Sequence, residues 1–267
     1  MRRTAITLIA AGIAASAVAG CGSSTSSSGS SASPAASTSS SPALSGSITV
    51  FAASSLKEAF TTLGQQFEAA HPGVKVTFSF AASSALATQI ISGSPADVFA
   101  SASPKNMQQV VTAGDASKPV DFTKNVMEVA VPPANPAHVT SVTDLAKSSV
   151  KVALCQPLVP CGATAAKVFA NAKVVVKPVT LQPDVKSVLT QVELGNVDAG
   201  VVYVTDVNAA GTKVKGIQIP DSLNASTEYP IAPISKSANV ATAQAFVAYV
   251  LSPAGQSVLT TDKFEKP

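Results

Sequence analysis

The chain has 267 residues, with 18 lysine and arginine residues against 15 acidic ones and a charged fraction of 12%. Nucleic-acid-binding proteins carry clustered lysine and arginine and a strong positive excess, and this sequence has neither. The low charge also excludes a disordered polyelectrolyte. Residues 46–267 contain no uninterrupted run of about eighteen apolar residues, which a membrane-spanning helix would need.

The first twenty residues are typical of an export signal. Arg2 and Arg3 precede an uncharged, largely apolar run over 4–20, which is the order of regions in a secretory signal peptide. The run ends at Cys21 in Val-Ala-Gly-Cys, which resembles the lipobox of bacterial lipoproteins, whose cysteine becomes the first, lipid-carrying residue. We therefore predict a lipoprotein signal peptide over 1–20 and a lipid on Cys21 that anchors the exported protein to the outer face of the cytoplasmic membrane. An ordinary signal peptide with an incidental cysteine is the alternative.

Residues 21–45 are expected to be a lipid-anchored, Ser-rich linker. Thirteen of the residues at 22–45 are serine and none is charged, which is a composition typical of a flexible coil. Both arginines lie in the leader, so the rest of the chain has 16 lysines against 15 acidic residues. The body that follows, 46–267, is long enough for a substantial core or for two lobes.

Beyond the linker, short runs of β-forming residues alternate with segments of helical periodicity. In chain order we expect a strand at 48–53, a helix over 56–67, a strand at 74–80, a helix at 84–91, a strand at 96–100, a helix from Pro104, strands at 126–131 and 150–154, a helix at 164–171, a strand at 174–179, a helix at 184–193, strands at 199–204 and 230–234, and a closing amphipathic helix over 240–251. This alternation predicts an α/β fold with parallel sheets and helices on both faces. In such sheets, ligands bind beyond the carboxyl ends of the strands.

Two strand-to-helix turns in the first half of the body are rich in hydrogen-bond donors. Ser55 follows the first predicted strand and Ser83 follows the second. A helix start that combines a hydroxyl with unpaired backbone N–H groups is a ready anion site. Ser55 and Glu58 also have the spacing of a capping box, so a simple role for Ser55 as a helix cap is the alternative.

Two similar turns occur in the second half, one with Cys161 at 159–164 and one with Val185 at 183–185. Tyr203, near the end of a predicted strand, can supply a phenol donor, and a partly buried core tyrosine is the alternative. A ligand that contacts donors from both halves of the chain would lie between two lobes.

The body contains two cysteines, Cys155 and Cys161, six positions apart. An exported location favours a disulfide between them. A zinc site would need two further ligands, and the only histidines are His71 and His138, both in proline-containing turns. We therefore do not expect a zinc site.

Enzyme motifs are not apparent in the body. It lacks a Gly-x-Ser-x-Gly elbow, and the segment 195–200 has the glycine spacing of a phosphate loop without the required Lys and Ser/Thr. No residue stands out as a catalytic base, so we do not expect an enzyme. An exported serine-dependent hydrolase with Ser55 or Ser83 as nucleophile, and a purely structural surface lipoprotein, are the alternatives from other classes.

Several of these segments together resemble the molybdate-binding proteins of bacterial molybdate ABC importers. They are 48–56 (ITVFAASSL), 80–87 (FAASSALA), 93–99 (GSPADVF), 159–162 (VPCG), 183–185 (PDV) and 200–203 (GVVY). The resemblance implies a type II periplasmic binding protein, in which two α/β lobes are joined by two crossover strands and the ligand cleft lies between them. With crossovers near 126–131 and 230–234, lobe I would comprise 46–127 and 231–267, and lobe II 128–230.

The resemblance also implies the ligand and its contacts. Molybdate, and with it tungstate, would be held as an oxyanion by five residues: hydroxyl and backbone N–H of Ser55 and Ser83, backbone N–H of Cys161 and Val185, and the phenol of Tyr203. The family commonly has alanine where this chain has Cys161, a tolerable departure because only the backbone is needed. A second departure is Glu58, whose carboxylate would oppose the anion unless it turns away.

Physical chemistry supports an oxyanion receptor of this type. Because the body has no arginine, it would hold a dianion through neutral dipoles and helix N-termini. We therefore expect a monomer without a cofactor that delivers molybdate or tungstate to the permease of an ABC importer, contacts the membrane through the lipid on Cys21, and binds no nucleic acid. A receptor for another tetrahedral oxyanion, such as sulfate or phosphate, is the alternative within this class.

Overall fold

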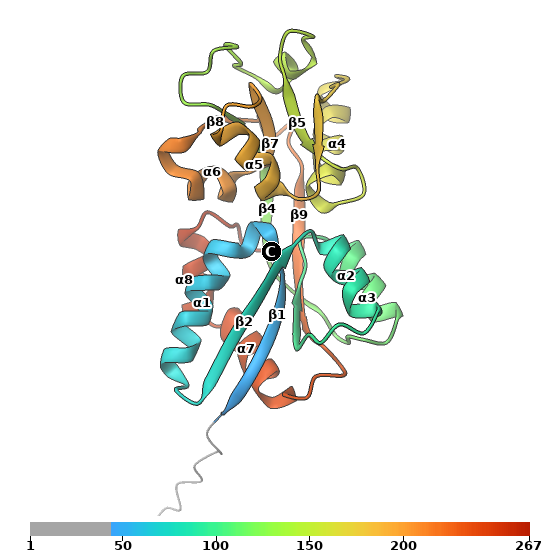
Figure 1. Ribbon diagram of the computed structural model, residues 1–267, viewed down its shortest axis with the longest axis vertical. Helices are drawn as coiled ribbons and strands as arrows, with labels where there is room; N and C mark the ends of the chain where they lie inside the picture. The colour runs from blue at the N-terminus through green and yellow to red at the C-terminus, as the bar shows by residue number, and fades with distance from the viewer. Residues whose placement is uncertain (1–43) are drawn as a thin grey trace, which may run out of the picture. The chain divides into compact units, whose positions relative to one another are not determined.

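The computed structural model of the protein describes residues 44–267, so the predicted signal peptide, Cys21 and the linker up to residue 43 lie outside it (Figure 1). Within 44–267, no helix is both long enough and apolar enough to cross a membrane. The described chain alternates strands and helices. This arrangement is the α/β architecture that the hydrophobic periodicity predicts.

In residues 44–267, nine strands form one sheet in the order β2-β1-β3-β9-β4-β7-β5-β6, and β8 pairs with β4 beside this path. The strands are β1 (Gly46–Ala53), β2 (Val74–Ala81), β3 (Val98–Ala100), β4 (Val120–Val131), β5 (Val152–Cys155), β6 (Thr180–Gln182), β7 (Ala199–Tyr203), β8 (Lys215–Gln218) and β9 (Ser226–Pro233). The neighbours of β1 are parallel to it, and β5 is parallel to β6 and β7. In contrast, β9 runs antiparallel to β3 and β4, and β4 runs antiparallel to β7 and β8. The sheet is therefore mixed, and the prediction of parallel sheets is wrong for the strands around β4 and β9.

The helices lie between and around these strands (Figure 1). They are η1 (Ser54–Leu56), α1 (Lys57–Ala70), α2 (Ser83–Ile91), α3 (Pro104–Thr112), η2 (Val142–Ala146), α4 (Pro160–Ala172), α5 (Val185–Glu193), α6 (Val204–Ala210), η3 (Gly211–Lys213), α7 (Val240–Leu251) and α8 (Pro253–Thr261). Three of them, α3, α4 and α8, begin with a proline, which suits the first position of a helix because no N–H is required there.

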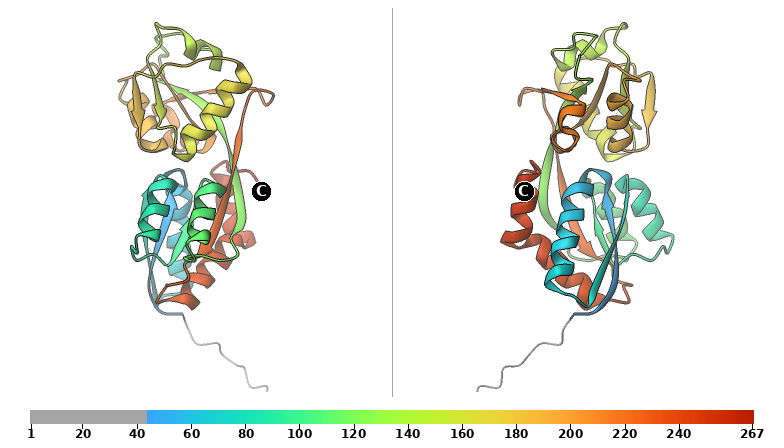
Figure 2. Two further views of the ribbon diagram at one scale, coloured as in Figure 1. Left: turned by 90° about the vertical axis from the view of Figure 1, so that its right-hand side faces the viewer. Right: turned by 60° about the vertical axis from the view of Figure 1, so that its left-hand side comes forward.

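Two lobes share the sheet, and the long antiparallel strands β4 and β9 run from one lobe into the other (Figures 1 and 2). Lobe I holds β1–β3 with α1–α3, α7 and α8, and lobe II holds β5–β8 with α4–α6. The exact residue boundaries given above for the lobes stay a prediction. The crossover strands are longer than the sequence pattern indicates, since β4 begins six residues before Val126 and β9 begins four residues before Pro230.

Separate hydrophobic cores stabilise the lobes. In lobe I, Leu56 of η1 and Phe60, Leu63 and Phe67 of α1 pack with Phe246 of α7 on one face of the sheet. A second cluster, built mainly from α2 and α3, covers the other face. Lobe II has one core, in which α4 and α5 pack against β5 and β7. The burial of large apolar side chains on the faces of the sheet is the main stabilising term for such a fold.

Some predicted elements are wrong. Residues 174–179 form no strand, and the strand that follows them is β6, at Thr180–Gln182, which pairs with β5. Helix α4 begins at Pro160, four residues before the predicted start, and the closing helical region is two helices, α7 and α8. The sequence pattern also missed α6 and β8.

Candidate functional site

A small cavity lies between the lobes at the carboxyl ends of β1, β2 and β7, the place at which ligands of open α/β sheets bind. Its volume is about 10 Å³, roughly that of one water-sized group, which suits a compact ion and not an organic molecule. All five of the residues proposed from the sequence as oxyanion contacts line it. The lining residues are Ala53, Ser54, Ser55, Ala81, Ala82, Ser83, Ala102, Pro160, Cys161, Asp184, Val185 and Tyr203.

Lobe I contributes two buried serine hydroxyls to this cavity. Ser83 is the first residue of α2, and its Oγ accepts the Ala102 N–H at 2.9 Å, so the hydroxyl proton remains to donate. The Ser55 Oγ lies 2.8 Å from the phenol oxygen of Tyr229. If Tyr229 donates this bond, the proton of Ser55 is likewise free for a ligand. Burial raises the pKa of the Tyr229 phenol, which therefore stays protonated.

The alternative role of Ser55 as a helix cap is wrong. Ser55 lies within η1, and α1 begins at Lys57 without a hydrogen bond from a capping side chain. The Ser55 side chain instead pairs with Tyr229, 174 positions away. No local pattern around Ser55 indicates this partner, which comes from a crossover strand.

Lobe II contributes the N-termini of two helices. Cys161 is the second residue of α4 and Val185 is the first residue of α5. The carboxylate of Asp184 caps α5 by accepting the N–H groups of Lys186 and Ser187, at 2.9 and 3.1 Å. This cap leaves the N–H of Val185 outside its hydrogen bonds, and the first N–H groups of a helix are the ones available to an anion.

A disulfide joins Cys155 at the end of β5 to Cys161, and the Cα atoms of the two residues are 5.8 Å apart. The next residue, Gly162, is packed so closely that a Cβ there would collide with the carbonyl oxygen of Gln156. The loop 155–161 and the start of α4 are therefore held against each other. Together they fix the backbone of Cys161 at the cavity.

Tyr203 supplies the fifth predicted contact from the end of β7. Its side chain is 1% exposed, and its hydroxyl has no hydrogen-bond partner among residues 44–267. Burial raises the pKa of this phenol, so it remains a donor. Buried polar groups are almost always paired in folded proteins. An unpaired phenol at the wall of a cavity therefore points to a ligand that accepts its proton.

Among residues 44–267, no positively charged side chain lines the cavity. Among residues 44–267, the one charged side chain that lines it is Asp184, whose carboxylate is turned to its own helix. From the sequence, the Glu58 carboxylate is expected to oppose an anion unless it turns away. In the structure this carboxylate pairs with the ammonium of Lys186, and the two groups are 2.8 Å apart. The donors that face the cavity are thus neutral hydroxyls and N–H groups.

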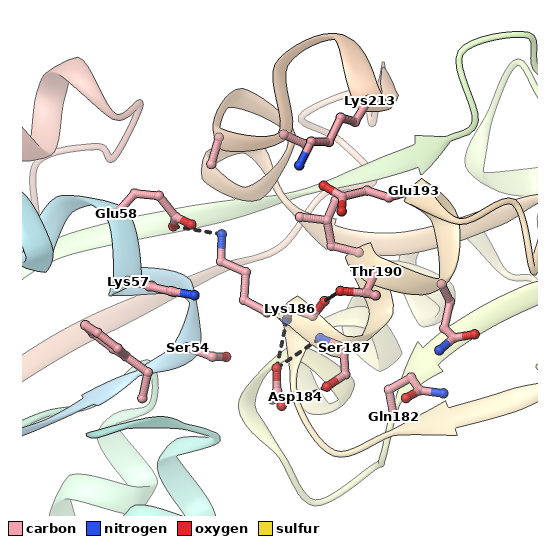
Figure 3. Close-up of a pocket in the computed structure, with 15 residues that line it drawn as sticks. Ser54, Lys57, Glu58, Gln182, Asp184, Lys186, Ser187, Thr190, Glu193 and Lys213 are labelled. Atoms are coloured by element: carbon pink, nitrogen blue, oxygen red, sulfur yellow. Dashed lines mark hydrogen bonds and ion pairs between the residues drawn. The ribbon is translucent and has the colours of Figure 1, made fainter. Parts of the chain in front are cut away.

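A wider groove of about 720 Å³ adjoins the cavity and shares Ser54 and Asp184 with it (Figure 3). Its walls carry Lys57, Lys186 and Glu58, as well as Glu193 and Lys213, so both signs of charge are present. Within the described part of the chain, no group of three or more His, Cys, Asp or Glu side chains could hold a metal ion.

The segment 195–200, with its phosphate-loop spacing, has a structural explanation. Gly195 follows α5 with a left-handed φ of 68°, which favours glycine. Gly200 lies in β7 against α5, where an added Cβ would stand 2.7 Å from Val188 and 3.0 Å from Val192. Gly195 therefore serves the termination of α5, and Gly200 serves the packing of α5 on the sheet.

A two-lobed α/β protein whose interlobe cavity is lined by neutral donors has the chemistry to bind a small anion. Comparison with known proteins agrees with this class: the chain belongs to the family of bacterial extracellular solute-binding proteins, whose model matches residues 48–265. Solute binding defines that family, and the family resemblance inferred from the sequence is confirmed.

Two relatives and one solved structure illustrate the similarity. The chain is 41% identical to the molybdate-binding protein ModA of Mycobacterium tuberculosis over 222 residues, which cover 83% of this chain and 85% of that protein. It is 34% identical to ModA of Escherichia coli, with 78% and 84% covered. The periplasmic molybdate-binding protein of Azotobacter vinelandii has the same fold, with a TM-score of 0.74 at 20% identity over 82% of this chain and 99% of that one. The predicted periplasmic-binding-protein fold is thus confirmed.

Proposed function

We propose that this protein captures molybdate, and tungstate with it, outside the cytoplasmic membrane and delivers the anion to the permease of an ABC importer. The observation that carries the proposal is the convergence of Ser55, Ser83, Cys161, Val185 and Tyr203 on one small cavity. The relatives named for molybdate binding supply the identity of the anion.

The geometry explains how a protein could hold a dianion without a cationic side chain. Helix N-termini carry partial positive charge and unpaired N–H groups, and α4 and α5 both begin at the cavity. The hydroxyls of Ser55 and Ser83 and the unpaired phenol of Tyr203 add directed donors. Because all these donors are fixed, tetrahedral dianions would be distinguished by size, which favours molybdate and tungstate over the smaller sulfate.

The site chemistry argues against the hydrolase alternative. Ser55 bonds to a tyrosine and Ser83 accepts a backbone N–H. Among residues 44–267, neither serine hydroxyl is bonded to a histidine or carboxylate that could act as a general base. We therefore propose that the protein is a binding protein without enzymatic activity. We further propose that the lipid on Cys21 tethers it beside its permease.

Isothermal titration of the purified full chain with molybdate, tungstate and sulfate in separate runs tests this function. We expect tight one-to-one binding of molybdate and tungstate and little heat from sulfate. Binding of sulfate alone would mean that the protein has the same fold and binds a different oxyanion. Absence of binding to all of these anions would contradict the proposal, and labelling by a serine-reactive probe would then favour the hydrolase.

A further inference from the structure

One lysine connects the two lobes beside the cavity. The ammonium of Lys186, on α5 of lobe II, lies 2.8 Å from a carboxylate oxygen of Glu58 on α1 of lobe I. It also lies 3.1 Å from Asp206 on α6 of its own lobe. Figure 3 shows the Lys186 side chain extended across the groove toward Glu58. The exposed fractions of the Glu58, Lys186 and Asp206 side chains are 44%, 20% and 0%.

The three charges are tied to segments that carry the proposed anion contacts. Lys186 directly follows Val185, and Glu58 lies on the helix that follows Ser55. Asp206 accepts the backbone N–H of Tyr203 through its second carboxylate oxygen, at 3.1 Å. The Asp206–Lys186–Glu58 bridge therefore links the backbone of Tyr203 and the start of α5 in lobe II to the start of α1 in lobe I.

Lys186 is not itself placed to bind the anion. It does not line the small cavity, and two carboxylates already share its charge. Although burial alone would lower the pKa of Lys186, the carboxylates of Asp206 and Glu58 outweigh that effect and raise it. The lysine therefore stays charged near neutral pH.

The two ion pairs differ in what they require of the lobes. The Lys186–Asp206 pair lies within lobe II and can persist when the lobes separate. The Lys186–Glu58 pair spans the lobes and can form only when η1 and α5 come into contact, as they do in this structure. Opening of the cleft would break this pair and return Glu58 to water.

We propose that Lys186 is a positioning residue and that the Glu58–Lys186 ion pair is an interlobe latch that holds the lobes closed over the bound oxyanion. This inference rests on the proposed function. Because the latch forms only on closure, it acts on the release of the anion. Its loss would speed dissociation and leave the first encounter with the anion unchanged.

Glu58→Gln in the full chain is the direct test, since it removes the interlobe pair and leaves Lys186 with Asp206. We expect the molybdate dissociation rate, followed by stopped-flow tyrosine fluorescence, to rise about two- to fivefold. The association rate and the unfolding temperature without ligand should not change. Added salt should speed dissociation from the wild type and have less effect on the variant.

Glu193→Gln is the matched control, because Glu193 lines the same groove and forms no ion pair across the cleft within residues 44–267. It should release molybdate at the wild-type rate. Lys186→Arg, which keeps the charge and can pair with both carboxylates, should retain slow release. Lys186→Met should release molybdate faster and, because it strands the buried Asp206, should also unfold at a lower temperature without ligand.

Binding of molybdate to the wild type separates the proposed function from the latch hypothesis. If the wild type binds molybdate and Glu58→Gln releases it at the wild-type rate with the same salt response, the latch is wrong and the proposed function stands. The latch is also wrong if Glu193→Gln and Glu58→Gln accelerate release equally. If the wild type binds no oxyanion, the proposed function fails and the latch with it.

Discussion

The two lobes approach the cavity with different chemistry. Lobe I presents side-chain hydroxyls, Ser55 and Ser83, each fixed by one hydrogen bond to a distant residue. Lobe II presents backbone N–H groups at the starts of α4 and α5, together with the Tyr203 phenol. A side-chain donor is lost by substitution, whereas a backbone donor survives most substitutions. The identity of the residue should therefore matter at Ser55, Ser83 and Tyr203, and the course of the backbone should matter at the starts of α4 and α5.

The sharpest test of a backbone donor is proline at Val185. Proline is tolerated at the first position of a helix. The residue before a proline prefers an extended backbone, and Asp184, which precedes Val185, already has one. Val185→Pro should therefore remove one N–H while α5 still forms. We expect molybdate affinity to fall by about 2 kcal/mol or more, the value of a hydrogen bond to a charged group. Val185→Ala, measured beside it by titration, should bind within about threefold of the wild type; an equal loss in both variants would contradict the backbone role.

Serine-to-alanine changes break the lobe I contacts. Ser83→Ala and Ser55→Ala should each reduce molybdate affinity by about 1–3 kcal/mol. Ser83→Ala should also lower the free energy of unfolding, because the buried Ala102 N–H loses its acceptor. Titration gives the affinities and urea denaturation the stabilities. Unchanged affinity in both variants would refute the assignment of these serines.

Tyr203→Phe separates affinity from stability. The phenol has no hydrogen-bond partner in residues 44–267, so its removal should leave the free energy of unfolding without ligand unchanged or slightly raised. Affinity for molybdate should fall by about 1–2 kcal/mol, because the bound anion loses one donor. A loss of stability without a loss of affinity would show that the hydroxyl serves the fold and not the ligand.

The smallest effect on binding is expected at the disulfide. Replacing Cys155 and Cys161 together by alanine keeps the Cys161 N–H, so affinity should change by less than about threefold. Loss of the cross-link should reduce the free energy of unfolding by about 2 kcal/mol, the chain-entropy value for so short a loop. A large drop in affinity would mean that the cross-link, and not the helix alone, positions this N–H.

The sequence predicts best those features that are local. The strand-to-helix turns at Ser55, Ser83 and Val185 are visible because β-type residues run directly into donors and a helical pattern. These turns, joined by the resemblance, led to the five residues that the structure brings to one cavity. Their roles as anion contacts stay a prediction.

Features that depend on distant partners could not be predicted in this way. The valine-rich segment 174–179 has strong β propensity, yet Pro178 has no N–H for a ladder, and only residues from Thr180 onward align with β5. Likewise, nothing near Tyr229 indicates that it bonds to Ser55. The Glu58–Lys186 pair joins helices far apart in the chain. The sequence pattern therefore gave no partner for the Glu58 carboxylate.

The position of β9 has a consequence for how the protein is made. In the sheet this strand lies between β3 and β4, yet it is synthesised after every strand and helix of lobe II. Lobe II is therefore continuous in the chain and can fold as soon as β8 has emerged. In lobe I, the edge of β3 stays unpaired until residues 226–233 have been synthesised. The core between α1 and α7 stays incomplete until α7 and α8 have been synthesised as well. A chain truncated before Ser226 would keep most of the lobe II core and lose the strand that completes the sheet of lobe I.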